Sequence, residues 1–288
     1  MDCIDLNEIK KSRHKAEIPL IIIAIILNFG ILTMMMLGFI YRYKIEDSIL
    51  SWFDMDNDLV SFFATVGFWF APAFMIVVAV RIVYSVKKMY HECYFMGVRV
   101  GERQFPEIYG IEKNYGELFK FKHIPKIFVS SSSSSAMVLN VPIASVSFVC
   151  IAPGVAVYTP NLVRFEIARN YAHIYFGHRS LIFYILTFCA QVVPIFGNLL
   201  RRTMEYSADY AARCILGKDM TIECVVKSCA HYLVARKMDV DDYYNRVTSP
   251  CGTEASFYYF FINMFSDISV PRYRIKALSD SNKHGRLL

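Results

Sequence analysis

The chain of 288 residues lacks the cysteine spacing on which many zinc and redox sites depend. It has eight cysteines, but no two of them form a Cys-x-x-Cys pair, and the closest two, Cys224 and Cys229, are five positions apart. Cysteine-bound zinc and a catalytic cysteine are therefore not expected.

A pattern typical of nucleic-acid binding is missing as well. The net charge is +6, but the basic residues stand mainly beside two uncharged stretches. There they can meet the anionic head groups of lipids, so lipid rather than nucleic acid is the expected partner.

Charge is also missing from two long apolar runs, 18–41 and 59–80. Each is long enough to cross a hydrocarbon layer of about 30 Å at about 1.5 Å per residue. The 55% hydrophobic content fits such a chain. A signal peptide is the alternative for the first run, but the run is too long and no Ala-x-Ala-like site follows it. A buried core helix is the alternative for both, yet neither run has a polar face. We expect an N-terminal region, 1–88, with two transmembrane helices.

The flanking charges predict the orientation of these helices. Basic residues precede the first run and follow the second, whereas the loop between the runs is acidic. By the positive-inside rule, both termini and residues 89–288 lie in the cytosol, and the protein is a multi-pass integral membrane protein. Its cysteines should then be mostly free thiols.

A third apolar stretch, 181–200, is harder to place. It contains Gln191, Pro194 and Asn198, which are costly in lipid. A full crossing would also separate the two motifs described next, which flank this stretch. We therefore expect a segment that dips into the membrane or lies on it.

The most informative motif is Arg169-Asn170-Tyr171-Ala172-His173. It lies in a predicted helix that has Pro160 in its first turn, a position that proline favours. Zinc peptidases have His-Glu-x-x-His at this spacing, since residues i and i+4 share one helical face and can hold one metal between them. Here Arg169 stands at the first ligand position, and a permanent cation cannot coordinate zinc. Asn170 stands at the position of the general base, and an amide does not take up a proton. Only His173 remains.

A second motif lies downstream, in a helix that should end at Gly217. Glu205-Tyr-Ser-Ala-Asp209 resembles the Glu-Tyr-x-x-Asp signature of HtpX-like and CAAX-prenyl-endopeptidase-like membrane zinc peptidases, although Tyr210 replaces the arginine that follows in that family. Further segments resemble the same family in the same order: 101–109, 124–129, 135–137, 145–151 and 270–278, the last with Val270 in place of a histidine. The resemblance covers about residues 89–280.

The resemblance implies an α+β fold, with a mainly helical zincin-like domain and a small β-sheet following the transmembrane hairpin. It implies that Glu205 stands at the third zinc-ligand position and that Asp209 supports the ligands. It also suits a bacterial inner-membrane protein.

The altered motif predicts that the chemistry is lost while the scaffold is kept. Arg169 can replace the charge of the metal by pairing with Glu205, or with Glu166 one turn earlier on its own helix. We expect no zinc, no proteolysis, and a role as a membrane-bound adaptor or regulator with a protein or peptide in the former substrate cleft.

Two alternatives remain open. The first is an active zinc metalloendopeptidase with an atypical site, such as His173, His178 and Glu205. Helix geometry argues against that set, because residues five apart on a helix point about 140° away from each other. The second is a scaffold protein whose function lies in the membrane hairpin.

Overall fold

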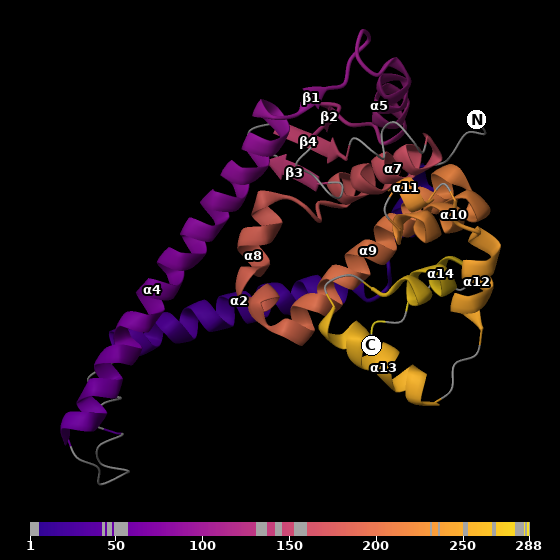
Figure 1. Ribbon diagram of the computed structural model, residues 1–288. Coiled ribbons are helices and arrows are strands. Elements are labelled where there is room, and N and C mark those ends of the chain that lie inside the picture. The colour runs from indigo at the N-terminus through magenta and orange to yellow at the C-terminus, as the bar shows by residue number, and fades with distance from the viewer. Residues whose placement is uncertain are drawn as a thin grey trace.

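The computed structural model describes residues 6–41, 44, 48, 57–130, 137–141, 146–152, 160–230, 232–235, 237–249, 253–266, 269–279, 285 and 287. These residues form a predominantly helical molecule with one small sheet (Figure 1), which confirms the predicted α+β class in this coarse form. Most of the predicted acidic loop, and residues 135, 136 and 145 of the motif segments, lie outside the described residues.

Two long helices project from the rest of the molecule (Figure 1). They are α2 (Glu17–Ile40) and α4 (Asn57–Tyr90), and the short helix α1 (Leu6–Lys11) precedes them. Within α2, the segment Glu17–Gly38 is long and apolar enough to cross a membrane, and it is the one such segment found in the described part of the chain. The second predicted span, 59–80, lies inside α4, where the side chains of 57–68 are outside the described residues. One membrane-length helix is therefore shown, and a multi-pass topology stays a prediction.

The sheet has four strands in the order β1-β2-β4-β3. The strands are β1 (Val98–Arg99), β2 (Lys126–Val129), β3 (Met137–Val141) and β4 (Val146–Ile151). β2 and β4 are parallel, and β1 and β3 are antiparallel edge strands. The strands expected within 124–129 and 145–151 are thus confirmed.

Alternation along these strands separates two apolar layers. Ile127 of β2 and Val149 of β4 join the main core, whereas Phe128 and Cys150 join a second cluster with Cys93 from the π-helical turn η1 (His91–Phe95). Successive side chains of a strand point to opposite faces, so the sheet is covered on both sides.

The main core is helical. It is built around α7 (Pro160–Phe176) and α9 (Pro194–Leu216), which pack against each other. Ala168 and Ala172 of α7 and Ala208 and Ala212 of α9 are all buried, and these small side chains let the two helices approach closely. The surrounding helices are α5 (Pro106–Leu118), α10 (Lys218–Ser228), α11 (Tyr232–Ala235), α12 (Val240–Thr248), α13 (Thr253–Phe265) and α14 (Pro271–Ser279).

The third apolar stretch is broken into two helices. α8 (Leu181–Val192) ends at Val192, Val193 joins the two helices, and α9 begins at Pro194, where proline suits the first helical turn. Since α8 has 12 residues and a span needs about 20, residues 181–200 do not form one continuous span. α8 packs along α2, where the Asn28 side-chain oxygen accepts a hydrogen bond from the Cys189 N–H at 2.9 Å.

The first residues of the chain also pack into the domain. Ile9 of α1 is buried in the main core, and α1 contacts α9. The side chain of Arg13 donates a hydrogen bond to the carbonyl of Phe176 at 2.6 Å. The region before the first apolar run is therefore tied to the end of α7.

Candidate functional site

The two motifs face each other across the contact between α7 and α9. Arg169 and His173 are four residues apart on α7, and Glu205 and Asp209 are four residues apart on α9. At this spacing each pair lies on one helical face. Asp209, His173 and Glu205 are all nearly inaccessible to solvent.

Arg169 is the centre of a cluster of ion pairs. Its Nη2 donates to Oε2 of Glu205, its Nε lies 3.2 Å from Oδ1 of Asp209, and its Nη1 lies 3.7 Å from Oε2 of Glu166. The side chain of Arg169 is only 15% exposed. The guanidinium therefore contacts both of the partners expected from the sequence, Glu205 and Glu166, and it donates its hydrogen bond to Glu205. It also contacts Asp209, which was not expected.

A second arginine completes the cluster from the far end of the chain. Arg274 of α14 donates to Asp209 through Nε at 2.7 Å and through Nη2 at 2.8 Å. Such paired, parallel bonds between a guanidinium and a carboxylate are strong and directional. Two cations and two carboxylates thus link α7, α9 and α14.

The opposite charges of Arg169 and Glu205 stabilise each other's ionised form. Burial opposes the charge of Arg169, but Glu205, Asp209 and Glu166 outweigh it and raise its pKa. Burial would raise the pKa of Glu205, but Arg169 in particular holds it well below its usual value. Burial raises the pKa of Glu166, with Arg169 opposing that shift. The Arg169–Glu205 pair is therefore ionised at neutral pH.

Asn170 turns toward its own helix. Its side-chain nitrogen donates to the carbonyl oxygen of Glu166, one turn earlier, at 2.6 Å, and lies 3.4 Å from Oε2 of the same residue. This is the local back-bond that short polar side chains make inside helices. The amide at the position where a general base was considered thus makes its hydrogen bond within α7.

His173 belongs to a buried polar chain that leads to the start of α2. Its Nδ1 lies 3.1 Å from Nδ1 of His178, and Nε2 of His178 lies 2.8 Å from Oε1 of Glu17. Glu17 also accepts a hydrogen bond from Ser207 of α9 and lies 3.3 Å from Nε of Arg13. The site is therefore connected to the first residue of the membrane-length helix.

The contact with Glu17 specifies one ring proton of His178. A carboxylate only accepts, so Nε2 of His178 carries a proton and donates to Glu17. Burial lowers the pKa of His173 to about 4, so its ring is neutral at pH 7. Nε2 of His173 lies 3.7 Å from Oε2 of Glu205.

The contact between His173 and His178 corrects the expectation that the two side chains diverge. That expectation assumed one continuous helix, but α7 ends at Phe176. Gly177 then takes a left-handed conformation, with φ of +78°, and the chain turns back. His178 therefore meets His173 ring to ring, with 5.3 Å between the ring centres.

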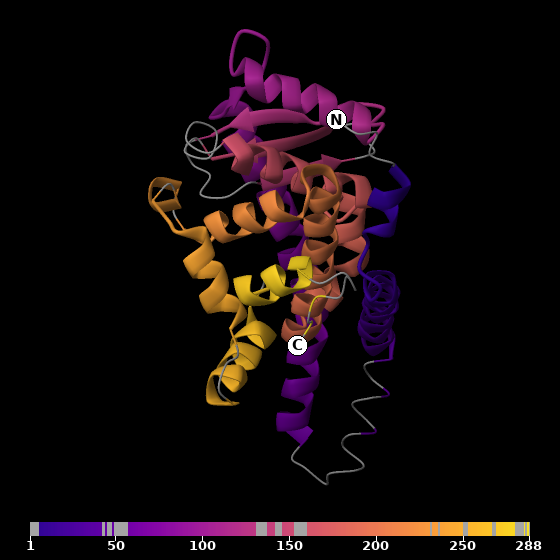
Figure 2. The ribbon, with the colours of Figure 1, turned by 90° about the vertical axis from the view of Figure 1, so that its right-hand side faces the viewer.

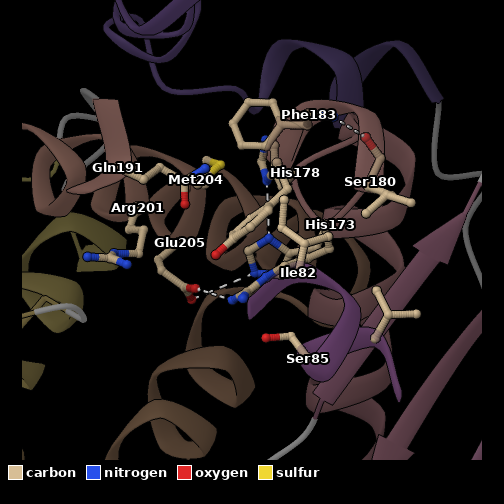
Figure 3. Close-up of a pocket in the computed structure, with 14 residues that line it drawn as sticks. Ile82, Ser85, His173, His178, Ser180, Phe183, Gln191, Arg201, Met204 and Glu205 are labelled. Atoms are coloured by element: carbon tan, nitrogen blue, oxygen red, sulfur yellow. Dashed lines mark hydrogen bonds and ion pairs between the residues drawn. The ribbon is translucent and has the colours of Figure 1, made fainter. Parts of the chain in front are cut away.

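A cavity of about 260 Å³ opens beside this site. Figure 3 shows His173 and Glu205 pointing toward each other, with Ile82 and Ser85 of α4 nearby. Arg179 also lines the cavity; its Nη2 donates to Oε1 of Glu205 at 3.0 Å, and half of its side chain is exposed. The other lining residues are Val86, His178, Ser180, Leu181, Phe183, Tyr184, Gln191, Arg201 and Met204.

Comparison with protein-family models, with curated proteins and with solved structures finds no match for this chain. Within the described residues, no group of three or more His, Cys, Asp or Glu side chains is placed to hold a metal ion.

Sequence reasoning brought Arg169, His173, Glu205 and Asp209 together but missed Glu17 and the roles of Arg179 and Arg274. Glu17 carried a usable signal, because it is an acidic residue directly before an apolar run and beside a basic arm. Arg274 lies in the last motif segment, but its partner is 65 residues away in the sequence. Nothing in the sequence indicated that contact.

Proposed function

We propose that the protein is a membrane-anchored relative of HtpX-like peptidases without zinc-dependent proteolysis, which binds a peptide segment of a partner protein in the former substrate cleft. One observation carries the proposal: the guanidinium of Arg169 lies between Glu205 and Asp209. The permanent positive charge of Arg169 thus lies where HtpX-like peptidases would have the first histidine ligand and the zinc ion.

The chemistry of this donor set argues against a bound metal. Zn²⁺ near Glu205 would meet Arg169 at close range inside a buried site, where two cations repel strongly. Arg169 cannot relieve the repulsion by losing its proton, because neighbouring carboxylates raise its pKa further. Even with a metal present, Asn170 could not take a proton from a bound water.

The cavity is suited to binding rather than to chemistry. Its apolar wall comes from α4 and α8, and its polar wall includes Arg179 and Ser180. Binding sites for small groups are commonly apolar with a few placed polar residues. We propose that one or two apolar side chains of the partner enter here, with Arg179 holding a carbonyl or carboxylate oxygen.

The membrane setting belongs to the same proposal. We propose α2, which is long and apolar enough to cross a membrane, as one span and α4 as the second. With the basic residues that flank them, the positive-inside rule then favours both termini and the main domain in the cytosol. We propose a multi-pass protein of a bacterial inner membrane whose cleft lies close to the cytosolic surface.

Restoring the motif tests this proposal. Parent protein purified in detergent, with metals measured by elemental analysis, should hold no zinc and show no chelator-sensitive self-cleavage. The double variant Arg169→His with Asn170→Glu should gain stoichiometric zinc, because it supplies a second imidazole at i, i+4 and a general base. Adding Glu205→Gln to this variant is the control and should remove the zinc again.

The opposite result would support an active zinc endopeptidase. One observation favours that candidate: the two Nδ1 atoms of His173 and His178 are 3.1 Å apart, near the separation of about 3.3 Å between two nitrogens on one zinc. If the parent carries stoichiometric zinc that is lost in His173→Ala or in His178→Ala, the non-catalytic proposal fails. Activity in membrane protein quality control would then be the function to test.

A further inference from the structure

α13 exposes a broad apolar face that no other described element covers. Five large side chains are between 49% and 66% exposed: Phe257, Tyr258, Phe261, Ile262 and Phe265. They recur at intervals of three and four residues, so they form one face of the helix. The sequence has no charged residue between Glu254 and Asp267.

Polar contacts on the opposite side hold the orientation of α13. The side chain of Asn263 is fully buried and accepts a hydrogen bond from the Val270 N–H at 3.3 Å. Asn198 of α9 donates to the carbonyl of Met264 at 3.3 Å, and Arg202 donates to the carbonyl of Ser266 at 3.2 Å. The described inward side of α13 thus carries one buried polar side chain, Asn263, and its outward side is apolar, whereas a helix facing water would put polar side chains outward.

α2 also combines a buried asparagine with an exposed apolar face. Asn28 is buried against α8, where it accepts from the Cys189 N–H, while Ile22, Ile26 and Phe29 point outward and are exposed. Two helices that expose large apolar side chains and bury an asparagine are suited to the same apolar surroundings.

The position of α13 supports a shared environment. Figures 1 and 2 show α13 in the lower part of the molecule, away from the sheet and α5, where α2 and the lower half of α4 also lie. α13 packs on α9, and Val193 and Ile195, at the turn where α9 begins, are also exposed and apolar. Exposed apolar side chains thus occur on α2, at the turn between α8 and α9, and on α13.

We propose that the outward face of α13 lies in the interfacial layer of the lipid bilayer, so that the domain contacts the membrane at a second place besides its spanning helix. With 13 residues the helix is too short to cross, and Phe is among the residues typical of the apolar face of helices that lie in the head-group layer. This inference depends on the exposed apolar face of α13 and not on the fate of the metal site.

Quenching of a single tryptophan by brominated lipid tests the proposal on the full chain. Trp52→Phe and Trp69→Phe remove both native tryptophans, Phe261→Trp places the probe on α13, and Glu117→Trp on the exposed face of α5 is the matched control. The variants are reconstituted in phosphatidylcholine vesicles whose acyl chains carry bromine near the head group. An interfacial helix is buried about 5 to 10 Å deep, so emission at 261 should fall about twofold relative to unbrominated vesicles, and emission at 117 should not change.

Two outcomes would overturn the proposal. Emission at 261 that is red-shifted and unquenched would place the face in water. Emission that is blue-shifted but insensitive to bromine would indicate a protein partner or a second copy of the chain. A retained melting transition in each variant shows that the probe reports on the folded protein.

Discussion

Replacing Arg169 with methionine should destabilise the protein because it removes the cation shared by two buried carboxylates. Methionine keeps most of the volume of the side chain, so packing changes little and the lost charge dominates. In the parent, Arg169 pairs with Glu205 and with Asp209, whose side chains are only 6% and 1% exposed. Both carboxylates would remain buried with one partner fewer.

The remaining partners set the magnitude. Breaking a buried ion pair by removing one member costs about 3 to 5 kcal/mol. Asp209 keeps both bonds from Arg274, and Glu205 keeps Arg179, although that arginine is half exposed. We therefore expect the lower end of the range, a loss of about 3 kcal/mol in the free energy of unfolding.

Thermal unfolding in detergent micelles, followed by tyrosine and tryptophan fluorescence, measures this effect. At about 2 to 4 °C per kcal/mol, the Tm of Arg169→Met should fall by roughly 6 to 12 °C. Adding Glu205→Gln to this variant should recover part of the lost Tm, because it removes the buried carboxylate whose remaining partner is the half-exposed Arg179. Lys113→Met is the matched control, because it breaks the exposed ion pair with Glu102 at 3.6 Å and should leave Tm unchanged.

An Arg169→Met variant as stable as the parent would refute the reasoning. Equal stability would mean that the guanidinium does not hold the two helices together. A loss that Glu205→Gln deepens would point to a role of Glu205 that does not depend on Arg169.

Two further predictions concern other parts of the molecule. Burial raises the pKa of Glu112 to about 7, so the folded protein holds a proton that the unfolded chain releases near pH 4.5, and stability should fall as the pH rises from 4.5 to 7. Glu112→Gln should remove this dependence, so the Tm of the variant relative to that of the parent should rise from pH 5 to pH 8. If the Tm of both proteins changes with pH in the same way, Glu112 is not the group responsible. Glu17→Ala should free the N-terminal arm, because Arg13 and His178 lose a buried partner at a cost of about 3 kcal/mol. Trypsin should then cut the arm faster than in the parent, whereas Glu8→Ala, on the exposed side of α1, should be cut at the parent rate.

Local patterns predicted the parts of the fold that depend on neighbours in the sequence. Proline at 160 and glycine at 217 mark the expected helix ends, and α7 starts at Pro160 while α9 ends at Leu216, directly before Gly217. The alternating strands appear as β2 and β4. The spacing of four residues within each motif predicted that Arg169 and His173 share one face of α7 and that Glu205 and Asp209 share one face of α9, because residues i and i+4 share a face in any α-helix.

Other features depend on contacts that no local pattern contains. The meeting of His173 and His178 required knowing that α7 stops at Phe176. The outward face of α13 was missed because an apolar helical stripe predicts burial without saying whether protein or lipid covers it. The bond from Arg274 to Asp209 joins residues 65 positions apart, and each of them alone reads as an ordinary charged residue.

α9 has a consequence for any shortened version of the protein. Within five residues it presents Glu205 to α7, Ser207 to Glu17 near the N-terminus, and Asp209 to Arg274 near the C-terminus. A fragment starting at residue 89 would lose Glu17 and uncover the place of Ile9 in the core. One ending before α14 would strip Asp209 of its strongest partner. Fragments designed for crystallisation or for fusion to a tag should therefore retain both terminal segments, even though Arg169, His173 and Glu205 lie far from either end of the sequence.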